Sequence, residues 1–294
     1  MRIKDIHIRD PFILPEGGRY YMYGSTISRS HEEPGFDAYV GDGLDDWIGA
    51  RPAFRPRADF WGLKDYWAAE VHGYRGEYYL FGTFTGADGV RGVGVLKSGS
   101  PGGPFADWSM GPVTPAGDMC LDGSLHVDAS GDPWLVYCHE WIQAIDGEVC
   151  AVRLSGDLAR SVGGPTVLFK SADVGWSVEA EVRGVRGWIT DGCFIHRMDG
   201  GGLVMLWSCA CPSGYCQNQA RSVGGSVMGP WEQAPSPLYA DDGGHGMVFR
   251  PFGGGLMMPL HKPNKSPLER AVLLEVEERG GWLAIVGGGG EGHA

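Results

Sequence analysis

Four carboxylates and one histidine stand at corresponding places along the chain, each next to a short apolar segment. They are Asp10, Glu70, Asp122, Asp191 and His245, and successive members lie 52 to 69 residues apart. Carboxylates that are brought together repel one another unless they are paired, protonated or metal-bound. For any single aspartate, the simpler interpretation is a side-chain hydrogen bond that caps a turn. For a whole set in phase with a repeat, we expect chemistry.

Several carboxylates around a neutral substrate are typical of glycoside hydrolysis. One carboxylic acid protonates the departing oxygen, while another carboxylate activates water or attacks the anomeric carbon. A third carboxylate can raise the pKa of the acid by repulsion. The abundant Trp and Tyr residues also suit sugar binding, because aromatic rings pack on the apolar faces of sugars.

The segments around these residues share one design, which the elements of a repeat must supply. A polar residue opens a short apolar strand, a Gly-containing turn follows in most cases, and a strongly apolar or aromatic strand comes next. This pattern occurs at residues 10–24, 67–82, 121–138, 190–207 and 242–260. Five hairpin repeats of about 59 residues predict an all-β fold, a five-bladed β-propeller with four-stranded antiparallel blades. The innermost strands line the axis, so we expect the five polar residues to converge there.

The amino-acid composition is typical of a fold of short strands and excludes some classes of binding partner. The chain has 294 residues, of which 50 are Gly and 33 are Trp, Tyr or Phe, and only 20% are charged, which disfavours a helical bundle. A net charge of −12 disfavours nucleic acid, and the lack of about 18 consecutive apolar residues disfavours a membrane span. A neutral oligosaccharide is the expected partner. We expect one domain over residues 1–294, with 287–294 as a loose glycine-rich tail.

Location is predicted from the thiols and the start of the chain. The seven cysteines are odd in number and are not spaced as a small disulfide scaffold. Residues 1–10 contain no apolar stretch of the kind that a secretory signal has. We therefore expect reduced thiols and a cytoplasmic location, and no motif suggests an organic cofactor.

The motifs resemble those of glycoside hydrolase family 43, which are five-bladed propeller enzymes that remove arabinose, xylose or related sugars. The resemblance runs in order from residue 10 to about residue 285. Each motif alone is weak, and six in order are specific. The matching segments are Asp10-Pro-Phe-Ile, Trp67-Ala-Ala-Glu70, Leu121-Asp122-Gly, Thr190-Asp191-Gly, Gly244-His245-Gly and Leu268-Glu269-Arg270.

The resemblance implies a role for each matching residue in an inverting single displacement. Asp10 would be the general base, Asp191 the general acid, and Asp122 the residue that orients the acid and raises its pKa. His245 would contact a central ion such as calcium, although a buried histidine bonded to backbone is an equally good interpretation. Residues expected to contact the sugar are Trp67, Glu70, Trp141 and Arg270, although Trp67 could equally serve blade packing.

The chain departs from the family at the acid, which is usually Glu. Asp191 is one methylene shorter, so its proton would sit about 1.5 Å further back. Three interpretations stay open: Asp191 is still the acid, Glu140 in Tyr137-Cys-His-Glu-Trp141 is the acid instead, or the site binds sugar with weak or no catalysis.

The sequence does not select one sugar. We expect removal of terminal sugars from plant-derived oligosaccharides, by an α-L-arabinofuranosidase first, a β-xylosidase second, and also conceivably a β-galactofuranosidase. An inverting phosphorylase is a minor alternative, because only Arg250, Lys262 and Arg270 could form the basic cluster that phosphate needs. A protein-binding propeller would explain the repeats but not an acidic pocket.

Overall fold

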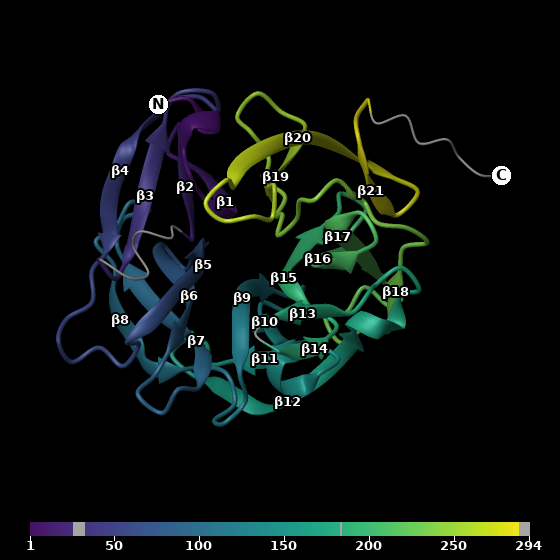
Figure 1. Ribbon diagram of the computed structural model, residues 1–294. Coiled ribbons are helices and arrows are strands. Elements are labelled where there is room, and N and C mark those ends of the chain that lie inside the picture. Colours follow the sequence, from purple (N-terminus) through teal and green to yellow (C-terminus); the bar gives the residue numbers. More distant parts are fainter. Residues whose placement is uncertain (26–32, 183, 288–294) are drawn as a thin grey trace.

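The computed structural model describes residues 1–25, 33–182 and 184–287 of the chain. Antiparallel sheets stand around a central axis, and their order follows the sequence (Figure 1). This arrangement is a five-bladed β-propeller, so the fold class predicted from the repeat is confirmed. In the expected tail, residues 288–294 lie outside the described part.

The first two blades come from the first third of the chain. Blade 1 contains β1 (Arg9–Glu16), β2 (Arg19–Ser25), β3 (Phe36–Gly41) and β4 (Trp47–Phe54). Blade 2 contains β5 (Lys64–Tyr74), β6 (Glu77–Thr85), β7 (Arg91–Ser98) and β8 (Ala106–Pro112). The β1–β2 turn has Gly17 and Gly18 with φ of 57° and 79°, which suits the two-residue hairpin that joins Glu16 to Arg19.

The next two blades are also four-stranded. Blade 3 contains β9 (Cys120–Val127), β10 (Pro133–His139), β11 (Glu148–Leu154) and β12 (Ser161–Lys170). Blade 4 contains β15 (Asp191–Arg197), β16 (Leu203–Cys211), β17 (Gly214–Ser222) and β18 (Trp231–Gln233). Between them lies a hairpin of β13 (Ala180–Val182) and β14 (Val185–Gly187). Short helices occur at η1 (Ile3–Asp5), α2 (Trp141–Ala144) and η2 (Ser171–Asp173).

Blade 5 differs from the others at its innermost strand. Its regular strands are β19 (Leu256–Lys262), β20 (Arg270–Arg279) and β21 (Trp282–Ile285). The segment 244–249 lies beside β19 but pairs with it only through the bridges Gly244–His261 and Phe249–Met257. The expectation of four regular strands is therefore wrong for this blade among the described residues. The reason is visible in the sequence, since Gly243, Gly244 and Gly246 surround His245 and weaken a regular strand.

Two contacts position the site. The ring closes where His7 bridges Arg270 and the Ile8 amide donates to the Glu269 carbonyl, which joins the N-terminal segment to blade 5. Inside the ring, the rings of Phe12 and Phe194 lie 6.3 Å apart, although blades 1 and 4 are not neighbours. These two side chains fill the axis beneath the inner-strand starts. The other apolar side chains form buried clusters within and between blades.

Candidate active site

One residue with a positive φ occupies a corresponding place in each inner strand, or in the segment 244–249 that replaces this strand in blade 5. These residues are Asp10 (54°), Ala68 (47°), Asp122 (56°), Gly192 (60°) and His245 (54°). Residues other than glycine seldom adopt this region because Cβ is crowded. In blades 1 to 4 the strand pairing also shifts at this residue, which marks a β-bulge. A bulge re-aims side chains, and here it directs Asp10, Asp122 and His245 toward the axis.

The same geometry corrects the alignment of the repeats. Ala68, not Glu70, takes the place in blade 2 that Asp10 takes in blade 1. Glu70 lies two residues further along β5, is buried, and has its Oε2 2.9 Å from His72 Nε2. In blade 4 the corresponding residue is Gly192, and Asp191 precedes it. The structure therefore brings together Asp10, Asp122, Asp191 and His245, while Glu70 is engaged with His72.

A side chain of the preceding blade accepts a hydrogen bond from each of these five backbone amides. In four cases the acceptor is Ser, Thr or His, and in blade 4 it is a carboxylate. The pairs are Ala68 N to Ser25 Oγ (2.8 Å), Asp122 N to Thr83 Oγ1 (3.0 Å), His245 N to Ser208 Oγ (2.8 Å), Asp10 N to His261 Nδ1 (3.2 Å) and Gly192 N to Asp122 Oδ2 (3.0 Å). Strained backbone persists only where its surroundings hold it, so the site depends on closure of the whole ring.

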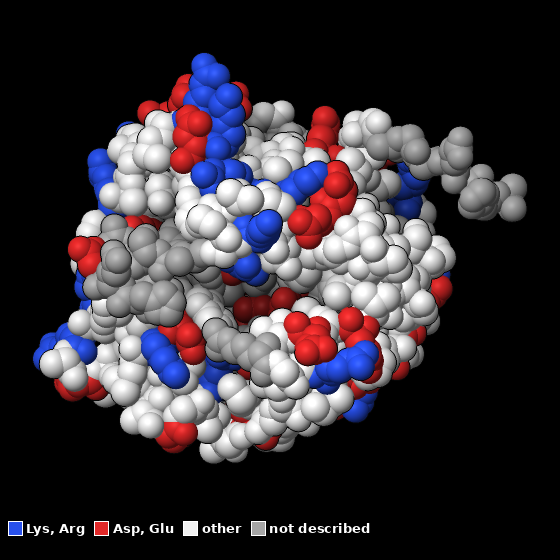
Figure 2. Space-filling view, in the orientation of Figure 1, with Lys and Arg blue, Asp and Glu red and all other residues white. Residues whose placement is uncertain are grey.

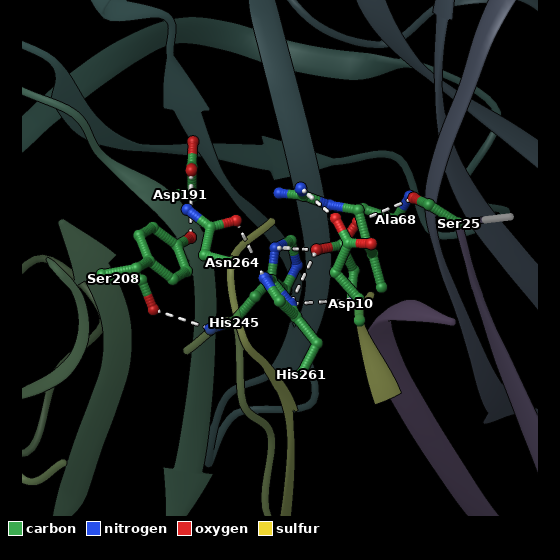
Figure 3. A network of polar contacts seen from close by, with 12 residues as sticks. Asp10, Ser25, Ala68, Asp191, Ser208, His245, His261 and Asn264 are labelled. Atoms are coloured by element: carbon green, nitrogen blue, oxygen red, sulfur yellow. Dashed lines mark hydrogen bonds and ion pairs between the residues drawn. The ribbon is translucent and has the colours of Figure 1, made fainter. Parts of the chain in front are cut away.

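Asp10 is held as a carboxylate. Its Oδ1 lies 3.0 Å from His245 Nδ1, and its Oδ2 accepts a hydrogen bond of 2.7 Å from Ser25 Oγ. Figure 3 shows His245 and His261 approaching Asp10 on one side and Ser25 on the other. Burial alone would raise the pKa of Asp10, but the His245 charge and hydrogen bond outweigh burial and lower it. An ionised carboxylate can accept a proton, which is what a general base needs.

The pKa values of Asp122 and Asp191 are raised, whereas that of Asp10 is lowered. Burial raises the pKa of Asp122 to about 7, and the charges of Asp191 and Asp10 act in the same direction against His245. Burial also raises the pKa of Asp191, although His245 and a hydrogen bond from Tyr215 partly oppose it. Two carboxyls with raised pKa values and one carboxylate with a lowered pKa thus share one site, a separation that is typical of acid and base roles.

The two axial histidines differ in charge. Burial would lower the pKa of His245, but Asp10 and Asp122 raise it to about 10. Burial lowers the pKa of His261 to about 4, so His261 is neutral. Its Nδ1 accepts the Asp10 amide hydrogen, and its Nε2 lies 3.2 Å from Asn264 Oδ1. His261 is therefore a support for the Asp10 backbone.

Sequence reasoning missed His261 and Tyr215 as parts of the site. His261 lies at the end of β19 and Tyr215 near the start of β17, so neither opens a repeat. Their rings stack 5.5 Å apart with an interplanar angle of 21°, and the Tyr215 hydroxyl donates to Asp191 Oδ2 at 3.0 Å. In the sequence, Gly244 is the residue beside His245 that relates to them. The structure shows why a glycine suits this place, because a Cβ there would lie 2.7 Å from the Tyr215 ring.

Glu140 belongs to a separate charged cluster beside the axis. It is buried and forms an ion pair with Arg91, whose other terminal nitrogen lies 3.3 Å from Asp65 Oδ2. The Arg91 guanidinium also lies 4.3 Å from the centre of the Trp67 ring. Burial raises the pKa of Glu140, while Arg91 opposes this shift. In this cluster Arg91 pairs with Glu140 and covers one face of the Trp67 ring.

The other expected sugar contacts, Trp141 and Arg270, stay predictions, and both side chains contact other parts of the protein. Trp141 begins α2 and its side chain is 5% exposed, which leaves little ring surface for a ligand. Arg270 donates to the carbonyls of Pro267 and Glu269. Arg9, which the sequence did not single out, lies near Asp10 and Tyr215 and donates to Glu269 Oε1 at 3.0 Å.

Two of the basic residues considered for phosphate, Lys262 and Arg270, are opposite each other on β19 and β20. Both are engaged within the protein: Lys262 pairs with Asp241, and Arg270 donates to backbone carbonyls. Arg250 pairs with Asp199.

The central ion implied by the resemblance stays a prediction. His245 Nδ1 lies 3.0 Å from Asp10 Oδ1 and 3.7 Å from Asp122 Oδ2. Among residues 1–25, 33–182 and 184–287, no group of three or more His, Cys, Asp and Glu side chains is arranged to hold a metal. We derive no step through an ion.

Figure 2 shows a hollow at the centre of the ring, with acidic side chains at its floor. The rings of Phe12 and Phe194 meet inside the propeller, 6.3 Å apart, and Phe194 is only partly buried. The described chain contains no helix that is long and apolar enough to cross a membrane.

Comparison with known proteins assigns the family. The family model for glycosyl hydrolases family 43 matches residues 3–282, and the chain belongs to this family. It is a glycosidase of an inverting family, which confirms the resemblance drawn from the motifs. A comparison with curated proteins gives no match.

Solved structures add detail. The chain is 40% identical to a structure described as the endo-arabinase from Bacteroides thetaiotaomicron VPI-5482, with a TM-score of 0.89, covering 96% of this chain and 98% of that one. A thermostable family-43 glycoside hydrolase is 21% identical, with a TM-score of 0.79 and coverages of 96% and 93%. An exo-1,5-alpha-L-arabinanase from a bovine ruminal metagenomic library is 18% identical, with a TM-score of 0.70 and coverages of 95% and 96%. The last two show likeness of fold.

Proposed function

We propose that this glycosidase hydrolyses α-L-arabinofuranosyl linkages in plant-derived oligosaccharides, with Asp10 as base and Asp191 as acid. The observation that carries the proposal is the split between the carboxyls of one hollow. Asp10 is held ionised by His245, while burial favours the protonated forms of Asp122 and Asp191. The sugar follows from the structure that is 40% identical, whose description names an endo-arabinase.

The reaction is a single displacement. Asp10 removes a proton from a water molecule as that water attacks the anomeric carbon. The bond from that carbon to the leaving oxygen breaks, and Asp191 gives its proton to this oxygen. Asp122 assists because a second carboxyl nearby makes ionisation of Asp191 less favourable. His245 stabilises the negative charge of Asp10 before the water attacks.

Glu140 is less suited to the acid role, although burial raises its pKa as it does that of Asp191. The ion pair with Arg91 engages the Glu140 carboxylate and opposes that rise. Among the described residues no Lys, Arg or His is bonded to Asp191, which accepts a hydrogen bond from the Tyr215 hydroxyl. The proposal therefore keeps Asp191 as acid and gives Glu140 the role of balancing Arg91.

We also propose a cytoplasmic location, supported by the thiols. All seven cysteines are free and buried in the described structure. The nearest sulfur pair described, Cys209 and Cys216, lies 3.6 Å apart. A reducing compartment keeps such thiols free.

The substrate is tested with nitrophenyl α-L-arabinofuranoside, β-D-xyloside and β-D-galactofuranoside, together with linear arabinan. Release from the arabinofuranoside or the arabinan supports the proposal, and release from the xyloside or galactofuranoside alone overturns it. The products from arabinan then define the mode of cleavage. Arabinose as the first product indicates terminal attack, as expected from the sequence, and a ladder of oligosaccharides indicates internal attack.

A further inference from the structure

Tyr215 touches the proposed acid directly from β17, which is separated from β15 by β16 in the same blade. Its hydroxyl donates a hydrogen bond of 3.0 Å to Asp191 Oδ2. Tyr215 is 3% exposed, so this hydroxyl has little access to water. A buried hydroxyl that meets a carboxylate makes a charge-assisted hydrogen bond and restricts the rotation of that carboxylate.

The Tyr215 ring is held by contacts with two segments of blade 5. One contact is the stacked ring of His261, which is itself held by the Asp10 amide and by Asn264. The other is Gly244, where a Cβ would come within 2.7 Å of the ring and would displace it. The Tyr215 amide also donates to Asp242 Oδ1 at 3.3 Å. A ring held in this way presents its hydroxyl at a defined point.

We propose that Tyr215 is a positioning residue for the general acid, which binds Asp191 Oδ2 and leaves Oδ1 to carry the proton toward the leaving oxygen. This inference rests on the proposed role of Asp191. It addresses the short side chain, since an aspartate cannot reach as a glutamate does and depends more on a fixed direction. A misplacement of about 1 Å can cost about 100-fold in rate.

Tyr215 also contacts both the support of the proposed base, Asp10, and the proposed acid, Asp191. Its ring packs on His261, which holds the Asp10 backbone, and its hydroxyl holds Asp191. Other charged or titratable groups facing Asp191 come from several elements. They are Asp10 and Arg9 from β1, Asp122 from β9, His245 from blade 5, Glu140 after β10, and the thiols of Cys138 and Cys209.

The test compares Tyr215→Phe with Tyr23→Phe. Tyr23 is fully buried and its hydroxyl donates to the Pro101 carbonyl, so the control also loses one buried hydroxyl bond but touches no carboxylate. For Tyr215→Phe we expect kcat/KM on arabino-oligosaccharides to fall about 10- to 100-fold, within the range of acid catalysis. On a nitrophenyl arabinofuranoside the fall should be several-fold smaller, because that leaving group needs little protonation. Tyr23→Phe should change both substrates equally.

The pH profile gives a second readout. The Tyr215 hydrogen bond lowers the pKa of Asp191, so Tyr215→Phe should move the basic limb of kcat/KM to higher pH. In an Asp191→Asn background, Tyr215→Phe should have no further effect on nitrophenyl arabinofuranoside. Equal losses on both substrates with an unchanged basic limb would show that Tyr215 only packs, and would overturn the inference.

A measurement without substrate separates this inference from the proposed function. In protein labelled with ¹³C at aspartate carboxyls, Asp191 is assigned by its loss in Asp191→Asn and titrated by NMR. Tyr215→Phe should raise the Asp191 midpoint, while Tyr23→Phe should not. A wild-type protein that cleaves no arabinoside would contradict the proposed function. An unchanged Asp191 midpoint in Tyr215→Phe would contradict the role of Tyr215, whatever the substrate.

Discussion

The carboxylate of Asp122 accepts a hydrogen bond of 3.0 Å from the backbone amide of Gly192, the residue that follows Asp191. At the other four inner-strand starts the corresponding amide is bound by an uncharged Ser, Thr or His side chain. Blade 4 thus has a carboxyl where the other blades have a neutral cap. This contact places Asp122 next to the proposed acid through the backbone, where it can orient Asp191, and the repulsion between the two carboxyls contributes to the raised pKa of Asp122.

Asp122→Asn tests this electrostatic role through stability. The pKa of Asp122 is about 7 in the folded protein and 3.8 ordinarily, so the folded state binds this proton more tightly than the unfolded chain. The stability that it contributes is complete below pH 3.8 and is lost as the pH rises through about 7. Asparagine cannot ionise, so the variant should gain about 2 to 4 kcal/mol relative to wild type between pH 4 and pH 8.

Urea unfolding of both proteins across this pH range measures the difference. Asp42→Asn is the control, because the Asp42 side chain is 75% exposed, and it should show no such trend. The activity of Asp122→Asn should fall, and its basic limb should move to lower pH because the repulsion on Asp191 is gone. A stability difference that is constant with pH would contradict a raised pKa for Asp122.

The identity of the acid is decided by Asp191→Asn against Glu140→Gln. We expect Asp191→Asn to lose about 100- to 10,000-fold on natural oligosaccharides, with much of the rate restored by a nitrophenyl leaving group. Glu140→Gln leaves the buried Arg91 without its closest counter-charge, so it should lose about 3 kcal/mol of stability. Its folded molecules should keep most of their activity. The reverse pattern of leaving-group rescue would make Glu140 the acid.

Ser25 links the strained backbone to the base, since its hydroxyl accepts from the Ala68 amide and donates to Asp10 Oδ2. Ser25→Ala leaves a buried amide unpaired, which should cost about 1 to 3 kcal/mol, and frees one side of Asp10. Ser208→Ala removes the equivalent cap from His245 without touching a carboxylate. Chemical unfolding should show similar losses for the two, and kcat should fall further for Ser25→Ala. Equal kcat values would mean that Ser25 serves folding alone.

The sequence predicted the propeller and most of the axial set, because both depend on a repeat. Asp10, Asp122 and His245 occupy the same positive-φ position in their blades, and Asp191 lies one residue before the corresponding Gly192. The repeat placed Glu70 at this position, where the structure has Ala68. The side chain at a left-handed position can be any type if a neighbouring blade holds the backbone, so residue type alone did not identify it.

Residues that support the site from second and third strands were not visible in the repeat. His261 of blade 5 holds the Asp10 amide of blade 1, Tyr215 reaches Asp191 within blade 4, and Arg91 meets Glu140 across blades 2 and 3. Such contacts depend on how the blades close into a ring. A pattern along one strand carries no information about them.

The central claim is that Asp10, held ionised by His245, is the base that cleaves arabinofuranosides. It is tested most directly by the rate of wild type and Asp10→Asn on nitrophenyl α-L-arabinofuranoside, with Asp42→Asn as the folded control. We predict that wild type and Asp42→Asn release nitrophenol at the same rate, and that Asp10→Asn is folded but at least about 100-fold slower. Release by Asp10→Asn at the wild-type rate would contradict the claim.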